Sequence, residues 1–154
     1  LKVVDATNYT VLATIPLGGS PHGLAVDADH GVVYVTQVDG DSVSIIDLAS
    51  ETVVDTVPVG AEPEWVSLVS NGAKAYVTNA GDGTVSVIDT ATRAVVNTIP
   101  VGSGAFYILA DEGAGLAYVT NAGADTVSVI DTGTDAVVDT IDAGDEPVGL
   151  ALSR

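Results

Sequence analysis

The chain alternates short apolar runs with clusters of Gly, Asn, Asp and Ser. Each run is rich in Val, Ile and Leu and is only about five residues long, which suits a strand better than a helix. Such runs, bounded by turn residues, predict β-strands that follow one another as an antiparallel meander. The clearest unit contains four predicted strands, A to D, at residues 65–69, 75–78, 84–88 and 94–101.

The pattern repeats with a fixed period. The tripeptide Tyr-Val-Thr begins at residues 34, 76 and 118, so that each copy starts 42 residues after the previous one. A period of about 40 residues with four strands in each unit is typical of propeller blades. The same spacing relates three further columns of residues: Asp5, Asp47, Asp89 and Asp131; Thr14, Thr56, Thr98 and Thr140; and Gly18, Gly60, Gly102 and Gly144.

The distribution of apolar and polar side chains predicts how the strands are covered. Strands A, B and C are apolar at nearly every position, so both of their faces must be buried. Strand D carries polar residues and contains Pro16, Pro58 or Pro100, and proline is confined to sheet edges because it cannot donate to a ladder. The predicted fold class is therefore all-β, a β-propeller of four-stranded antiparallel blades. A parallel β-helix and an immunoglobulin-type sandwich are the rivals, but neither combines four turn-bounded strands with one long period.

The repeat predicts a single partial propeller. Three complete blades cannot close a ring of this kind. We favour the interpretation that the chain is an excerpt of a longer propeller; the alternative is closure through other copies, as a homo-oligomer or a filament that shares strands. The expected parts are a C–D hairpin at 1–18, complete blades at 19–60, 61–102 and 103–144, and a lone A strand at 148–152 within residues 145–154.

The repeated motif resembles a known family. Tyr-Val-Thr-Asn at residues 76–79 and 118–121, with Val-Ser-Val-Ile-Asp-Thr at 85–90, is similar to the YVTN family of β-propeller repeats. That resemblance implies an archaeal or bacterial surface-layer-type protein with a fold related to lactonase propellers, located outside the cell or on its surface. The first copy departs from the motif at Gln37, and the last D strand has Asp142 in place of proline.

The charge balance excludes some partners. The sequence has 21 Asp and Glu against 4 Lys and Arg, a net charge of −17. A nucleic-acid partner is not expected, because phosphate binding needs a cationic face. Insertion into a membrane is not expected either, because no apolar run approaches the roughly 18 residues of a membrane helix. The excess of acidic residues suggests a halophilic source, where salt screens self-repulsion; a cation-gathering surface and an ordinary acidic surface are the alternatives.

The start of strand A is where the copies differ most, and there we expect a ligand site. Strand A lines the central channel of a propeller, so these side chains should gather at its mouth. The residues are His22, Glu64, Trp65, Phe106 and Tyr107.

Two chemistries are conceivable for these side chains. His22 and Glu64 are weak candidates for a divalent cation or for proton transfer, but two ligands are too few for a convincing metal site. We therefore assign no cofactor, no metal ligand and no catalytic residue. Trp65, Phe106 and Tyr107 are candidates for an aromatic platform that binds a sugar or peptide, with packing between blades as the alternative.

Residues present in every copy are interpreted as structural. Asp47, Asp89 and Asp131 end strand C, where a carboxylate can accept backbone N–H bonds and fix the turn into strand D. Asn79 and Asn121 are expected to act in the same way after strand B. The Thr of each Tyr-Val-Thr is expected to be an ordinary sheet residue.

These observations lead to three hypotheses of function. We favour a non-catalytic scaffold for protein or glycan binding, adhesion or assembly at a cell surface. The first alternative is a lactonase-like or lyase-like enzyme that uses a divalent cation at the channel mouth. The second is a structural subunit that polymerises by strand sharing.

Overall fold

The computed structural model describes residues 1–153 and consists almost entirely of β-strands. A two-stranded N-terminal hairpin is followed by three four-stranded sheets, which we call the first, second and third blades. The only helical segment in this part of the chain is a single 3₁₀ turn, η1 (Val38–Gly40). The hairpin consists of β1 (Lys2–Val4) and β2 (Val11–Thr14). The first blade consists of β3 (Pro21–Asp27), β4 (Val32–Gln37), β5 (Ser42–Asp47) and β6 (Thr52–Pro58), and the second of β7 (Pro63–Val69), β8 (Lys74–Asn79), β9 (Thr84–Asp89) and β10 (Ala94–Pro100). The third blade consists of β11 (Ala105–Asp111), β12 (Leu116–Asn121), β13 (Thr126–Asp131) and β14 (Ala136–Asp142).

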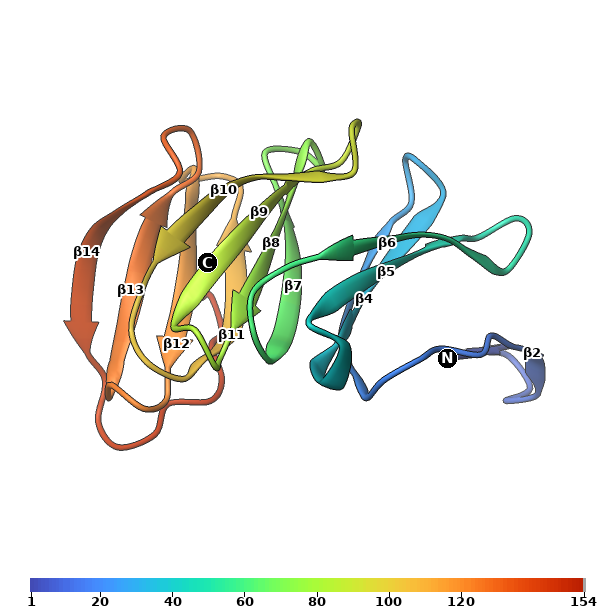
Figure 1. Cartoon of the computed structure of the whole chain (residues 1–154), viewed down its shortest axis with the longest axis horizontal. Coiled ribbons are helices and arrows are strands. Elements are labelled where there is room, and N and C mark those ends of the chain that lie inside the picture. Colours follow the sequence, from blue (N-terminus) through green and yellow to red (C-terminus); the bar gives the residue numbers. More distant parts are fainter. Residues whose placement is uncertain (154) are drawn as a thin grey trace.

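Within each sheet, every strand pairs antiparallel with the next one along the chain, so each blade is a meander in the order A, B, C, D. The three A strands β3, β7 and β11 contact one another in sequence, and the blades pack face to face (Figure 1). The D strands β6, β10 and β14 lie at the opposite edge, where Pro58 and Pro100 end their ladders. The predicted β-propeller architecture is confirmed.

The core lies between blades. Between the first and second blades, Tyr34 and Ile45 pack against Val66 and Val77. Between the second and third blades, the equivalent residues of the next repeat form a second apolar cluster, which includes Tyr76 and Ile108. Both faces of the second blade are therefore covered, as the apolar runs of its strands predict.

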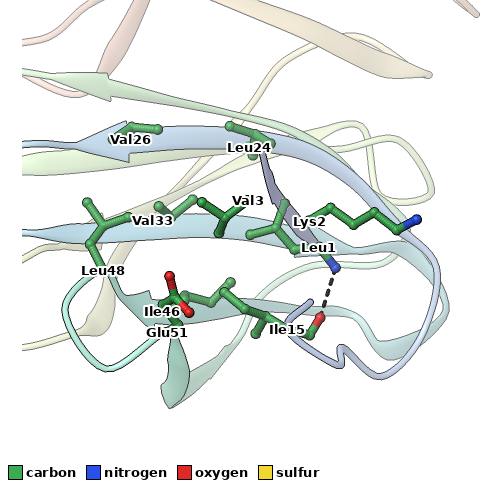
Figure 2. A pocket seen from close by; sticks show the side chains of 10 residues that line it. All are labelled: Leu1, Lys2, Val3, Ile15, Leu24, Val26, Val33, Ile46, Leu48 and Glu51. Atoms are coloured by element: carbon green, nitrogen blue, oxygen red, sulfur yellow. Dashed lines mark hydrogen bonds between the residues drawn. The ribbon is translucent and has the colours of Figure 1, made fainter. Parts of the chain in front are cut away.

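The first blade is covered only in part. Ile15 and Val3 of the N-terminal hairpin pack on Val33 and Ile46. Beyond them an apolar cavity of about 240 Å³ lies beside Leu24, which is 45% exposed. Figure 2 shows this cavity, with the Leu1 amino group donating a 2.9 Å hydrogen bond to the Ile15 carbonyl. In a complete blade, strands A and B would cover this face.

One part of the predicted architecture differs. Residues 148–152, expected to form a lone A strand, contain no strand. The physical reason is that strand A of a blade hydrogen-bonds only to its own strand B, and within residues 1–153 no strand B pairs with this segment. The segment still approaches the open face of the third blade, because Leu150 and Leu152 line a cavity together with Leu109 and Tyr118.

No helix within residues 1–153 is long and apolar enough to cross a membrane.

Candidate functional site

The start of each A strand contains an irregularity that shapes the candidate site. Strand β7 pairs with β8 at Pro63 and next at Val66, so that Glu64 and Trp65 together lie opposite the single residue Thr78. The same break occurs in β3 and β11. Such bulges bend a strand and redirect its side chains, and they are frequent beside functional sites.

Threonine hydroxyls satisfy the backbone groups that these bulges release. Thr78 Oγ1 accepts a hydrogen bond from the Trp65 N–H at 3.0 Å and donates to the Phe106 carbonyl of the next blade at 2.7 Å. Thr36 Oγ1 lies likewise between the Gly23 N–H, at 2.8 Å, and the Glu64 carbonyl, at 3.0 Å. Both threonines are fully buried.

The threonine of Tyr-Val-Thr therefore does more than fill a sheet position: it ties the start of one A strand to the start of the next. Sequence reasoning missed this role. Its signal was present, since a polar residue in an apolar strand recurs in every copy, but the partner carbonyl 28 residues away is visible only in the fold.

The structure brings all five predicted site residues together. Nδ1 of His22 lies 2.5 Å from Oε2 of Glu64, on the neighbouring blade, with His22 exposed and Glu64 half-buried. The His22 ring also meets Trp65 edge-on, with ring centroids 6.3 Å apart, and Phe106 at 5.8 Å. Trp65 packs on Tyr107 at 4.8 Å and 45°. We call this group of five side chains the mouth cluster.

Gly23 makes room for the cluster. It occupies the place in the first blade that Trp65 and Tyr107 occupy in the others. A side-chain carbon at Gly23 would lie 2.8 Å from Trp65 Cα and 3.2 Å from Cδ2 of its ring, so the indole approaches the first blade only because position 23 has no side chain. Trp65 is partly buried against the core between the second and third blades, so it serves packing as well as the surface of the cluster.

The cluster supplies two groups that could hold a cation, the His22 ring and the Glu64 carboxylate. Within residues 1–153, no three His, Asp or Glu side chains converge on a metal-binding arrangement. The chemistry that the cluster can perform by itself is proton transfer within the His22–Glu64 pair and apolar contact through its three aromatic rings.

The residues assigned to turns fall into two groups. Asp89 accepts the Thr92 N–H at 2.7 Å, and Asp47 and Asp131 make the equivalent bond in their blades, so their turn role is confirmed. Hydrogen bonds from the backbone and side chain of Thr92 hold the pKa of Asp89 below its usual value.

The expected turn role of Asn79 and Asn121 is wrong. The Asn79 amide is buried and donates to the hydroxyls of Thr84 and Ser86, at 3.0 and 2.9 Å. Asn121 makes the same pair of bonds in the third blade. Both acceptors belong to β9, and Gly60 leaves room for the amide, because a side-chain carbon at position 60 would lie 2.7 Å from Asn79 Nδ2.

Comparison with known proteins agrees with the architecture. Residues 15–115 match the model of a family described as YNCE-like β-propeller. No curated protein matches the sequence.

Solved structures give the same fold. Hydrazine synthase of Kuenenia stuttgartiensis superposes with a TM-score of 0.83 and 25% identity, over 90% of this chain and 41% of that one. A functionally unknown protein from Desulfotomaculum acetoxidans gives 0.76 and 18%, over 89% and 47%. The dihydro-heme d1 dehydrogenase NirN in complex with DHE gives 0.71 and 15%, over 87% and 30%. The chain spans less than half of the length of each of these proteins.

Proposed function

The chain belongs to the YNCE-like β-propeller family, and from this premise we propose that it is a non-catalytic binding scaffold whose mouth cluster binds a neutral glycan. The observation that carries the proposal is the meeting of Trp65, Phe106 and Tyr107, from two blades, with the paired side chains of His22 and Glu64. Aromatic rings offer apolar faces to a ligand, and a few placed polar groups fix its orientation.

The charge of the chain supports a neutral ligand. A net charge of −17 repels anions over long range, and it would attract cationic peptides to many parts of the surface rather than to one site. The resemblance to YVTN repeats adds the proposal that the protein works outside the cell or on its surface, in binding or adhesion.

Trp65 makes the proposal testable at the site itself, because it is the only tryptophan of the sequence. We expect titration with neutral oligosaccharides to change its fluorescence in a saturable way. Tyr107→Ala should weaken binding by about tenfold, the loss of roughly one aromatic contact. Tyr9→Ala is the matched control, because Tyr9 is an exposed aromatic residue of the N-terminal hairpin.

A saturable response to a peptide library but not to oligosaccharides would assign the site to a protein partner instead. If neither library changes the fluorescence of Trp65, or if Tyr107→Ala and Tyr9→Ala bind alike, the mouth cluster is not a ligand site.

The contact between His22 and Glu64 favours a second candidate, an enzyme that uses a divalent cation at the channel mouth, with further ligands from outside these three blades. Isothermal titration with Ca²⁺ and Mn²⁺ tests this candidate. A site would lose affinity at least tenfold in the double variant His22→Ala/Glu64→Ala, and unchanged affinity would remove the metal-dependent candidate.

A further inference from the structure

The repeat places equivalent residues at the two interfaces between blades, at the end of the blades opposite to the mouth cluster. Position 34 in the first blade corresponds to 76 in the second, and position 93 corresponds to 135 in the third. The two interfaces hold the same tyrosine but opposite charges facing it, Arg93 in one case and Asp135 in the other. The interface between the first and second blades therefore lacks the carboxylate that faces the tyrosine in the other interface.

Between the second and third blades the polar groups satisfy one another. The Asp135 carboxylate accepts hydrogen bonds from Lys74 Nζ, at 2.7 and 2.8 Å, and from the Tyr76 hydroxyl. Lys74 Nζ also donates to the Thr132 carbonyl at 3.1 Å. Tyr76 is fully buried, so a carboxylate at this place completes a network that would otherwise hold an unpaired buried hydroxyl.

Between the first and second blades no carboxylate stands at this position; Asp27 and Asp89 lie nearby but are hydrogen-bonded to His30 and Thr92. Arg93 adopts the same left-handed backbone as Asp135, with φ of 55° and 53°, so both residues start from the same place in the turn. Tyr34 is 1% exposed, and no residue in the described part of the chain hydrogen-bonds to its hydroxyl. A cavity of about 280 Å³ lies at this interface, and it is lined by His30, Val32, Tyr34, Thr90, Ala91 and Arg93.

The basic side chains of this cavity retain donors for a ligand. Arg93 Nη1 lies 3.9 Å from the Asp55 carboxylate, too far for a hydrogen bond. His30 Nδ1 is paired with the buried Asp27 at 2.8 Å, and its Nε2 makes no hydrogen bond to residues 1–153. Lys74 is replaced here by Val32, so Arg93 is the strongest donor at the site.

We propose that this cavity binds a small-molecule carboxylate in the place that Asp135 takes in the next interface. The ligand carboxylate accepts a hydrogen bond from the Tyr34 hydroxyl and pairs with the Arg93 guanidinium, whose planar fork suits two carboxylate oxygens. The volume lies just below the usual 300–1,000 Å³ of ligand pockets, so the ligand is a short mono- or dicarboxylate. Because the chain is strongly acidic, salt that screens its charge should assist binding.

Nuclear magnetic resonance tests the proposal at the cavity itself. Acetate and succinate are titrated at pH 7, with sodium chloride at equal ionic strength as the reference and phosphate as a second anion. We expect saturable shifts of the Thr90 and Ala91 amide signals with the carboxylates. Tyr34→Phe and Arg93→Gln should each weaken binding at least fivefold. Tyr76→Phe is the matched control and should leave these shifts unchanged.

A gain of binding in a variant of the other interface provides a second test of the proposal. Asp135→Ala removes the internal carboxylate and leaves Lys74 and Tyr76 facing a cavity of the same kind. Acetate should then raise the melting temperature of this variant by about 3 °C beyond its effect on the parent protein.

Three results would overturn the proposal. One is that chloride or phosphate produces the same amide shifts as the carboxylates. Another is that Arg93→Gln and Tyr34→Phe bind acetate as the parent protein does. The last is that Asp135→Ala folds but gains nothing from acetate.

Discussion

Leu24 and Ile108 occupy the same position in two blades and have opposite environments. Each pairs with the second residue of its Tyr-Val-Thr motif, Val35 or Val119. Leu24 is 45% exposed, whereas Ile108 is 1% exposed, and Val66 at the same place in the second blade is 2% exposed. The strands are alike, so the difference comes from the neighbour: Ile108 faces a complete blade and Leu24 faces only a hairpin. Stability in this fold therefore lies between the blades, as in other repeat architectures.

The largest effect is expected from truncating these two side chains. Ile108→Ala should lower the free energy of unfolding by about 3 kcal/mol, because it opens a cavity in the core between blades. Leu24→Ala should change it by less than about 0.5 kcal/mol, as at other exposed sites. Urea denaturation followed by circular dichroism measures both. Comparable losses in the two variants would mean that the first blade is covered in solution.

The buried threonines of the second and third blades should also differ in how much they stabilise the fold. Thr78→Val leaves the Trp65 N–H and the Phe106 carbonyl without their buried partner and should cost about 2 kcal/mol. Thr120→Val should cost only about 1 kcal/mol, because Thr120 bonds to Tyr107 of its own blade and to no residue beyond it in the described chain.

Thermal and urea unfolding of both variants measure these losses of unfolding free energy. Thr36→Val should lose as much as Thr78→Val, since Thr36 also bridges two blades. Equal losses at Thr78 and Thr120 would show that the bridge between blades carries no stability.

The sequence predicts the strands within each blade, but it does not predict the contacts between blades. The strands predicted at 84–88 and 65–69 are observed as Thr84–Asp89 and Pro63–Val69, because alternation, turns and period are local properties. The mouth cluster was also predictable, since columns that vary within a constant repeat stand out.

What the sequence could not predict depends on contacts between blades. The exposure of Leu24 cannot be inferred from a strand that looks like its buried equivalents. The contact of Tyr76 with Asp135 spans 59 residues and appears in one interface only, so neither a motif nor the period indicates it.

The smallest effect should come from the turn carboxylates, and it should be the same in every blade. Hydrogen bonds from Thr92 lower the pKa of Asp89, and Ser50 and Thr134 do the same for Asp47 and Asp131. A carboxyl group with a lowered pKa in the folded state contributes stability above its unfolded value of about 3.9, and the contribution is lost as the pH falls through the folded value. Replacing any one of the three by Ala should therefore lower the melting temperature by about 1 °C at pH 7 and by less at pH 3. These bonds lie within one turn, so a neighbouring blade should make no difference to them. A loss confined to Asp89, in the blade covered on both faces, would mean that even the turns depend on contacts between blades.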